Sequence, residues 1–192
     1  GPVVPVVAVT AVVESPVLLL PPELVPPTLL PVAAQAADPA KPAGAAPHIV
    51  FIMADDLGYA DLGCYGGREA DFGPVSPHID RLAAGGVKFT QGYANSPVCS
   101  PTRFALITMR YQYRLRGAME EPINSRSKGS TTLGLPPEVP TLPSLLRDAG
   151  YDTALIGKWH LGSLPTFGPL KSGYDRFFGN YGGAIDYFTH KP

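Results

Sequence analysis

Residues 48–54 read His-Ile-Val-Phe-Ile-Met-Ala and run directly into Asp55-Asp56-Leu57-Gly58. An apolar run without polar alternation is typical of a strand that is buried on both faces of a parallel sheet. In open α/β sheets, ligands bind beyond the carboxyl ends of such strands. The run therefore predicts an α/β fold, and it places two carboxylates where a ligand would bind.

The adjacent carboxylates of Asp55 and Asp56 predict a bound cation. Hard oxygen donors favour Ca²⁺ or Mg²⁺ over Zn²⁺, and the chain has no His/Cys cluster with the spacing of a zinc site. An isolated Asp-Asp pair is more often a solvated turn. Its position after a buried strand is what favours the metal site here.

The second informative stretch is Cys99-Ser-Pro-Thr-Arg103, which leads into an apolar segment ending at Arg110. Ser100 is a favourable N-cap and Pro101 suits the first helical position, so we expect a helix that begins next to Cys99. The N-terminus of a helix stabilises an anion, and Arg103 adds a cation one turn along. The alternative is a buried structural cysteine with Arg103 as a surface charge.

Residues 141–160 predict a helix followed by a strand. Thr141 caps a helix over 142–149, which has apolar residues at helical spacing and ends at Gly150. Residues 151–157 then read as the next buried strand, and this strand leads to Lys158 and His160. Because side chains alternate along a strand, Lys158 and His160 are expected to share one face and to converge on an anion, while Trp159 packs on the other.

Other segments give weaker signals. Ser76-Pro77 predicts a short helix that ends near Ala84, and residues 87–90 look like a strand. Residues 111–140 are polar and predict an irregular excursion or lid. Its basic residues either attract an anionic substrate or are simply solvated; they are Arg114, Arg116, Arg126 and Lys128.

Composition excludes several classes of protein. The 192 residues, 45% of them hydrophobic, suffice for one core of ordinary size. A formal charge of −1 without a basic stripe argues against a nucleic-acid partner. The two cysteines, Cys64 and Cys99, do not make a disulfide framework, and we expect them to be unpaired.

Residues 1–47 differ from the rest, because they hold eleven of the 23 prolines and few charges. The prolines interrupt every apolar run before it reaches the roughly 20 residues that a membrane-spanning helix needs. We therefore expect a leader rich in Pro, Ala and Val that is either disordered or derived from a signal peptide, and no membrane span. Ala34-Gln35-Ala36 is similar to a signal cleavage site, although no basic segment precedes it.

The pattern Cys99-x-Pro-x-Arg103, with its tail Leu106-Ile-Thr-x-Arg110, resembles the signature of the type I sulfatases, in which the cysteine is oxidised to formylglycine. Met109 departs from the family tail, which usually has Gly there. Further stretches resemble the same family in the same order: the Asp55-Asp56 pair with the loop 57–67, the Pro-x-Ile-Asp-x-Leu-Ala pattern at 77–83, Gly-Lys-Trp-His-Leu-Gly at 157–162, and the aromatic segment from 173.

The resemblance implies an alkaline-phosphatase-like fold, a mostly parallel sheet between helices, over residues 48–192. It implies sulfate ester hydrolysis by a gem-diol formed from formylglycine at Cys99. Asp55, Asp56 and the modified Cys99 would bind Ca²⁺, Arg103 and Lys158 would stabilise negative charge, and His160 would accept a proton. The implied partners are a sulfated small molecule or glycan and the enzyme that generates formylglycine. The implied location is extracytoplasmic: periplasmic, secreted or lysosomal.

Sulfatases are considerably longer than this chain, and the second Asp-Asn metal pair, second His and second Lys of the family have no counterpart here. We therefore expect an N-terminal portion of a sulfatase domain that has little activity alone. Three alternatives remain open: a phosphonate or phosphate ester hydrolase with the same nucleophile, an inactive truncated pseudo-enzyme or binding module, and a Cys–His hydrolase. The last leaves the Asp55-Asp56 pair unexplained.

Overall fold

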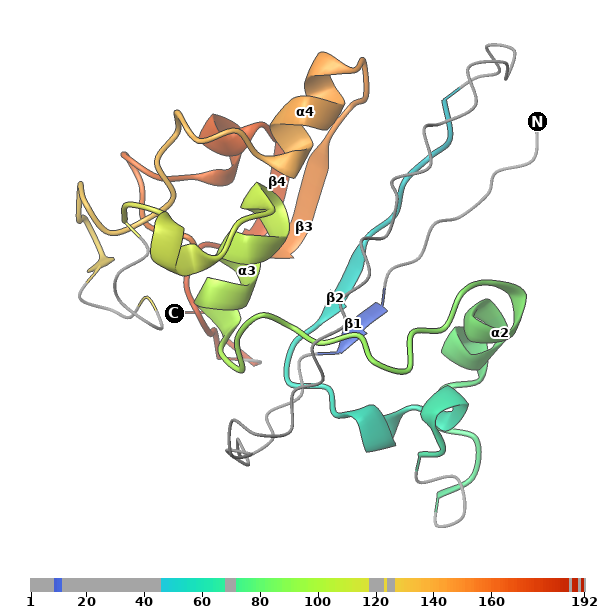
Figure 1. The fold of residues 1–192 in the computed structure, drawn as a ribbon. Helices are drawn as coiled ribbons and strands as arrows, with labels where there is room; N and C mark the ends of the chain where they lie inside the picture. The colour runs from blue at the N-terminus through green and yellow to red at the C-terminus, as the bar shows by residue number, and fades with distance from the viewer. Residues whose placement is uncertain are drawn as a thin grey trace, which may run out of the picture. The chain divides into compact units, whose positions relative to one another are not determined.

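The computed structural model describes residues 9–11, 46–67, 72–117, 123, 127–186, 188–189 and 191. It divides into two compact units (Figure 1). Of the described residues, the first unit comprises 9–10, 46–54, 59–67 and 72–90, and the second comprises 11, 55–58, 91–117, 123 and those from 127 onward. The predicted leader lies outside the described residues except for 9–11 and 46–47, and so does Arg126. No helix in the described ranges is long and apolar enough to cross a membrane.

In the first unit, one helix packs on a glycine-rich loop. The loop holds two short 3-10 helices, η2 (Tyr59–Asp61) and η3 (Gly63–Tyr65), and helix α2 spans Pro77–Gly85. The predicted α2 helix is confirmed, with Pro77 in its first turn. Ser76 precedes the helix without capping it, because its hydroxyl accepts a hydrogen bond from the Gly63 amide at 2.8 Å and donates to Asp80.

Of two strand predictions in this unit, the one at 48–54 is confirmed only in part and the one at 87–90 is wrong. The run 48–54 forms only the short strand β2 (Ile52–Ala54), which pairs with β1 (Val9–Ala11), and its Ile49, Val50 and Ile52 side chains are exposed. Apolar composition favours burial, but burial needs covering elements, and the described residues place none on this run. Residues 87–90 are irregular, and the Phe89 carbonyl accepts hydrogen bonds from tyrosine hydroxyls instead of from a neighbouring strand.

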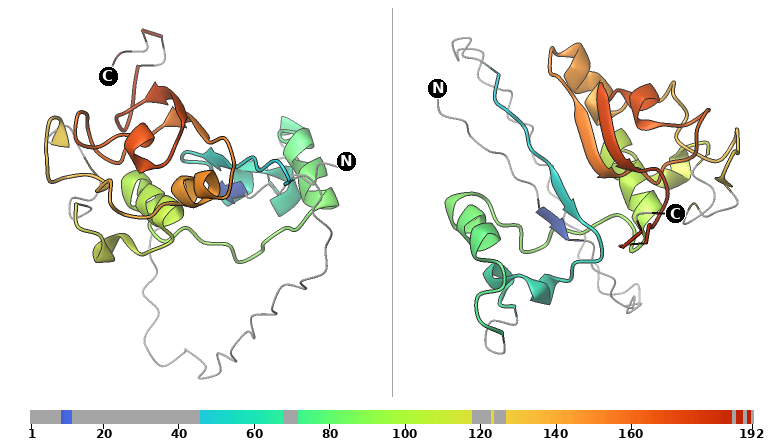
Figure 2. Two further views of the ribbon diagram at one scale, coloured as in Figure 1. Left: turned by 90° about the horizontal axis from the view of Figure 1, so that it is seen from above. Right: turned by 180° about the vertical axis from the view of Figure 1, so that it is seen from behind.

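The second unit contains a parallel two-stranded sheet with helices on one face. Strand β3 (Ala154–Lys158) pairs with β4 (Arg176–Asn180) so that Ile156 lies opposite Phe178. Helix α3 (Cys99–Thr108) packs against one face, and α4 (Leu142–Asp148) contacts α3 (Figures 1 and 2). The opposite face is open: Ile156 and Phe178 are each 79% exposed. Strand β3 is thus confirmed as parallel, but it is buried on one face only.

The described residues of 111–140 contribute to the core and do not form a lid. They include the 3-10 helix η4 (Gln112–Arg114). The apolar side chains of Leu115, Ile123 and Leu135 are buried against Phe104 and Trp159. The exposed Arg116 side chain pairs with Glu138 at 3.5 Å, so its charge is locally balanced. The segment is irregular as predicted, and it serves as packing for α3 and for the segment after β3.

Helix α4 begins as its sequence predicts. The Thr141 hydroxyl accepts a hydrogen bond from the Ser144 amide, and the Ser144 hydroxyl accepts one from the Thr141 amide, which forms a capping box. Thr141 is buried and also donates to the Ser172 carbonyl. A short 3-10 helix, η6 (Pro169–Ser172), is therefore tied to the start of α4.

Met109 ends helix α3 in the left-handed conformation, with φ 56°. A side chain in this conformation costs roughly 1–2 kcal/mol, and glycine avoids that cost but loses about 0.5–1 kcal/mol of backbone entropy on folding. Because Met109 is 74% exposed, little packing is lost when it is replaced.

We expect Met109→Gly to stabilise the chain by about 0.5–1 kcal/mol, which raises the Tm by roughly 2–4 °C. Thermal unfolding followed by circular dichroism measures this. The matched control, Arg110→Gly, carries the same change at a neighbouring exposed position without positive φ and should lower the Tm. A lower Tm for both variants would contradict the conclusion that the left-handed conformation of Met109 destabilises the chain.

Candidate functional site

Cys99 is the first residue of helix α3, so the helix starts two positions earlier than the sequence indicates. Its N-cap is Val98, so the prediction that Ser100 caps the helix is wrong. Ser100 is fully buried, and its hydroxyl accepts a hydrogen bond from the Ile123 amide at 2.8 Å. The Thr102 hydroxyl donates to the Ser96 carbonyl at 2.8 Å. The helix start is thus fixed by tertiary hydrogen bonds, and the Cys99 sulfur remains at the end that stabilises an anion.

Arg103 extends from the first turn of α3 toward the end of β3. Its Nη1 donates to the Lys158 carbonyl oxygen at 2.7 Å, and its Nη2 lies 3.8 Å from Asp55 Oδ2. Burial lowers the pKa of Arg103, whereas the nearby charges of Asp55 and Cys99 raise it. Arg103 is therefore a fixed cation within electrostatic reach of Cys99. The surface-charge alternative does not hold, because its side chain is only 12% exposed.

Lys158 is the last residue of β3, and its Nζ donates to Asp55 Oδ2 at 2.7 Å. The side chain of Lys158 is 18% exposed and that of Asp55 is 40% exposed. One carboxylate oxygen thus contacts both Lys158 and Arg103. This Asp55 cluster, consisting of Asp55, Arg103 and Lys158, carries a net positive charge and would attract a tetrahedral oxyanion.

His160 is buried, with 6% exposure, and lies beyond the end of β3 in the left-handed conformation, with φ 57°. Strand alternation therefore does not apply to it, and the predicted geometric reason for pairing it with Lys158 is wrong. The two side chains are nevertheless close enough to interact. Burial is the main reason that the pKa of His160 is lowered, and the charges of Lys158 and Arg103 lower it further.

The hydrogen bonds of His160 define its tautomer. Its Nε2 lies 2.6 Å from the Ile123 carbonyl oxygen, which can only accept, so Nε2 carries the proton. Nδ1 is buried and has no hydrogen-bond partner among the described residues. A neutral imidazole in this state offers Nδ1 as a proton acceptor.

Asp56 follows Asp55 with φ 59°, which turns the chain, and its side chain is exposed. Within the described ranges, Asp56 makes none of the contacts that join the Asp55 cluster, and no group of three or more His, Cys, Asp or Glu side chains is arranged to hold a metal. Asp55 and Asp56 are nevertheless chemically suited to a hard cation such as Ca²⁺, because both carboxylates offer oxygen ligands. Ca²⁺ takes six to eight oxygens, so other ligands would be needed.

Two parts of the site were not predicted from the sequence. The Ile123 carbonyl belongs to the backbone and therefore has no residue signature. Tyr174 lies near Arg103 and packs edge-on to Trp159, with ring centroids 6.5 Å apart, and burial raises its pKa. The aromatic segment from 173 was marked by its resemblance to the family, but that resemblance assigned no role to Tyr174.

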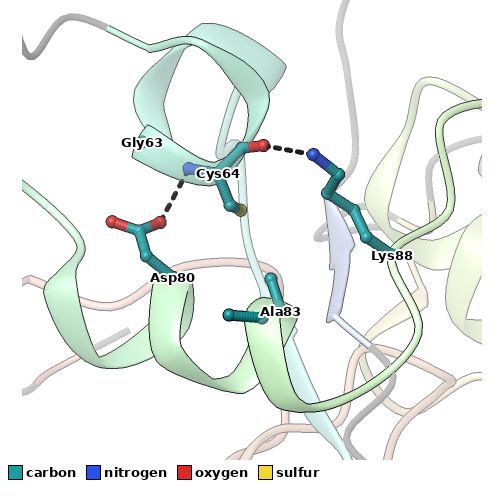
Figure 3. A pocket seen from close by; sticks show the side chains of 6 residues that line it. Gly63, Cys64, Asp80, Ala83 and Lys88 are labelled. Atoms are coloured by element: carbon teal, nitrogen blue, oxygen red, sulfur yellow. Dashed lines mark hydrogen bonds between the residues drawn. The ribbon is translucent and has the colours of Figure 1, made fainter.

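The first unit contains a separate hollow of about 350 Å³ (Figure 3). Its lining includes Cys64, Asp80 and Lys88 and none of the predicted site residues. The Cys64 amide donates to Asp80 at 2.7 Å, and Lys88 donates to the Cys64 carbonyl at 2.8 Å, so these polar groups hold the loop on α2. Both cysteines are free, as predicted. Burial, with a smaller effect of Asp80, raises the pKa of the Cys64 thiol, which makes it a poor nucleophile.

Comparison with known proteins gives a consistent result. The family model described as Sulfatase matches residues 47–192. Steryl-sulfatase of Mus musculus is 47% identical over 154 residues, covering 75% of this chain and 24% of that protein. N-acetylgalactosamine-6-sulfatase of Canis lupus familiaris is 39% identical over 136 residues, covering 70% of this chain and 25% of that protein. The chain thus spans about a quarter of the length of these relatives.

A solved structure supports the fold. The crystal structure of Ps i-CgsB matches with a TM-score of 0.61 and 38% identity, covering 70% of this chain and 28% of that one. The same protein has also been solved in complex with k-i-k-neocarrahexaose. The predicted α/β fold, alkaline-phosphatase-like and incomplete, is confirmed. On the match over residues 47–192 and these identities, the chain belongs to the sulfatase family.

Proposed function

We propose that this chain contributes one wall of a sulfatase site that hydrolyses a sulfate ester at Cys99. The observation that carries the proposal is the Asp55 cluster beside the N-terminus of α3, where Lys158 Nζ and Arg103 Nη2 lie 2.7 and 3.8 Å from one oxygen of Asp55. Two held cations beside a helix N-terminus favour a tetrahedral oxyanion at the Cys99 position. The sulfated substrate would be a small molecule or a glycan, and the protein would act outside the cytoplasm.

Formylglycine at Cys99 would supply a hydrated aldehyde, whose hydroxyl is the nucleophile. The residues around it would divide the remaining work. Arg103, fixed by its bond to the Lys158 carbonyl, would stabilise negative charge near the nucleophile, and Lys158 would neutralise sulfate oxygens. His160, neutral and with Nδ1 free to accept, would take a hydroxyl proton. Asp55 and Asp56 would hold a divalent cation, for which Ca²⁺ is the best fit.

The direct test is hydrolysis of a chromogenic aryl sulfate by the chain after co-expression with a formylglycine-generating enzyme. Conversion is verified by the mass of the peptide that contains Cys99, which exchanges one sulfur and two hydrogens for one oxygen. We expect very slow turnover, because the second His and second Lys of the family have no counterpart in this sequence, and a missing general acid costs roughly 10²–10⁴-fold. Cys99→Ala should abolish the turnover, because it removes the covalent route.

The Tm of Cys99→Ala is the folding control, because truncation at a partly buried position should cost only about 1 kcal/mol. Turnover that persists in this variant would contradict the proposal. An aryl phosphonate is assayed in parallel. If it is hydrolysed faster than the sulfate, the protein is a phosphonate ester hydrolase with the same nucleophile.

The cation assignment is tested by calorimetric titration with Ca²⁺. We expect weak binding that is lost in Asp55→Asn/Asp56→Asn, because two carboxylates supply few of the six to eight oxygens and Lys158 already occupies Oδ2 of Asp55. The control Asp148→Asn/Asp152→Asn removes the same charge from exposed positions and should leave the isotherm unchanged. Equal isotherms for all three proteins would rule out the site.

The lowered pKa of His160 predicts how stability depends on pH. In the unfolded chain the imidazole titrates near its usual value of about 6.5, so below that pH the unfolded state binds more protons than the folded state. The stability that neutral His160 contributes is therefore complete above about pH 6.5 and is lost as the pH falls through the folded pKa.

We expect the Tm to fall between pH 7.5 and pH 5, and to fall less in His160→Gln. Asp175 and Asp186, whose pKa values are lowered by hydrogen bonds, lose their contribution only below about pH 4, so they do not obscure this window. His78→Gln, which changes an exposed histidine, is the control. A pH dependence that is the same in His160→Gln and in the unsubstituted chain would show that His160 is not buried in its neutral form.

A further inference from the structure

Gly183 lies against the imidazole ring of His160. A Cβ atom at position 183 would stand 2.7 Å from Cε1 and 2.8 Å from Nε2 of His160, and 3.3 Å from Nδ1. Non-bonded heavy atoms attract best at about 3.5–4.0 Å, and these separations are well inside that range. Any side chain at position 183 would therefore displace the ring.

The requirement for glycine comes from the ring and not from the backbone. Position 183 does not adopt the left-handed conformation that disfavours other residues, so an alanine there is free of backbone strain. The adjacent Gly182 differs in its surroundings, because a Cβ there would meet only Asn180 Oδ1 at 3.6 Å and the Ala184 carbonyl at 3.9 Å. Both distances are ordinary van der Waals contacts, so the space at 182 is not restricted.

The imidazole has little freedom to avoid such a contact. Its Nε2–H donates to the Ile123 carbonyl, its residue is 6% exposed, and its backbone is fixed with φ 57°. A ring that is displaced from this position would no longer keep the present geometry of its 2.6 Å bond to the Ile123 carbonyl. Losing that bond would release the tautomer in which Nδ1 is the acceptor.

We propose that Gly183 is a positioning residue for His160: its missing side chain leaves the space in which the imidazole keeps Nε2–H on the Ile123 carbonyl and Nδ1 free to accept a proton. The use of Nδ1 as a base rests on the sulfatase function proposed above. The positioning itself does not, because it depends only on contacts within the second unit. Gly183 touches the ring and not the substrate.

The first test follows the histidine side chains by NMR in Gly183→Ala, with Gly182→Ala as the matched control. Ring ¹⁵N and ¹³C shifts report the tautomer and the pKa, and His160→Gln assigns the signals of His160 among the four histidines. In the unsubstituted chain and in Gly182→Ala we expect the Nε2–H tautomer. In Gly183→Ala we expect a mixture of tautomers and a changed pKa, because burial, which lowers the pKa of His160, and the Ile123 hydrogen bond, which raises it, both depend on the position of the ring.

The charged groups around the ring determine how that shift is interpreted. Lys158 and Arg103 lower the pKa of His160, and Asp55 raises it. Because Gly182→Ala and Gly183→Ala alter no charge, a shift confined to Gly183→Ala reports movement of the ring. Identical tautomer and pKa in all three proteins would overturn the proposal.

The second test remains informative if Gly183→Ala folds poorly. In a double-mutant cycle, the Tm change caused by Gly183→Ala is measured with His160 present and in the His160→Ala background. We expect a drop of several degrees with His160 and a much smaller one without the ring, because the steric conflict is with the ring alone. An equal drop in both backgrounds would assign Gly183 a purely structural role and refute the proposal.

These two tests do not depend on turnover. A chain without sulfatase activity that loses the Nε2–H tautomer in Gly183→Ala supports the positioning and contradicts only the proposed chemistry. An active chain whose His160 signals are unaffected by Gly183→Ala would support the proposed chemistry and contradict the positioning role of Gly183.

Discussion

The carboxylate of Asp55 compensates the charges of two mostly buried cations in the second unit, Lys158 and Arg103. Lys158 and Arg103 keep only 18% and 12% of their side chains exposed, and a mostly buried cation is costly unless an anion or hydrogen bonds compensate it. Asp55 Oδ2 lies beside both, and Arg103 also donates to the Lys158 carbonyl. One interaction thereby ties together the 55–58 segment, the first turn of α3 and the end of β3. Since two cations share one carboxylate, positive charge remains available for an anionic ligand.

Burial of His160 keeps its imidazole in the neutral form. In water an imidazole is partly protonated near neutral pH, and a protonated ring cannot accept a proton. Desolvation and the two neighbouring cations keep the ring neutral, and the Ile123 carbonyl selects which nitrogen holds the proton. Ile123 also contacts the first turn of α3, because its amide donates a hydrogen bond to the Ser100 hydroxyl. Ile123 therefore holds both the start of α3 and the imidazole of His160, the two groups to which the proposed function assigns the nucleophile and the base.

The exposed sheet face is consistent with the coverage of the relatives. Ile156 and Phe178 face each other across β3 and β4 at 79% exposure each, whereas the opposite face packs on α3 and the Trp159 core. Parallel sheets are normally covered on both faces. The matched relatives are about four times as long as the region they share with this chain, and in proteins of that length further elements are available to cover such a face.

The sequence by itself determined the family, and it also supplied the proposed site residues, because Cys99, Arg103, Lys158 and His160 lie in strings whose residue types and spacing are specific. It also determined α2, α4 and the parallel strand β3, since capping and periodicity are local properties. It did not determine burial. The run 48–54 looked like a core strand and is exposed, because burial depends on which elements cover a segment. Only the tertiary structure decided the Asp55 cluster, the Val98 cap and the tautomer of His160, since each depends on atoms from segments far apart in the chain, including backbone groups that carry no sequence signature.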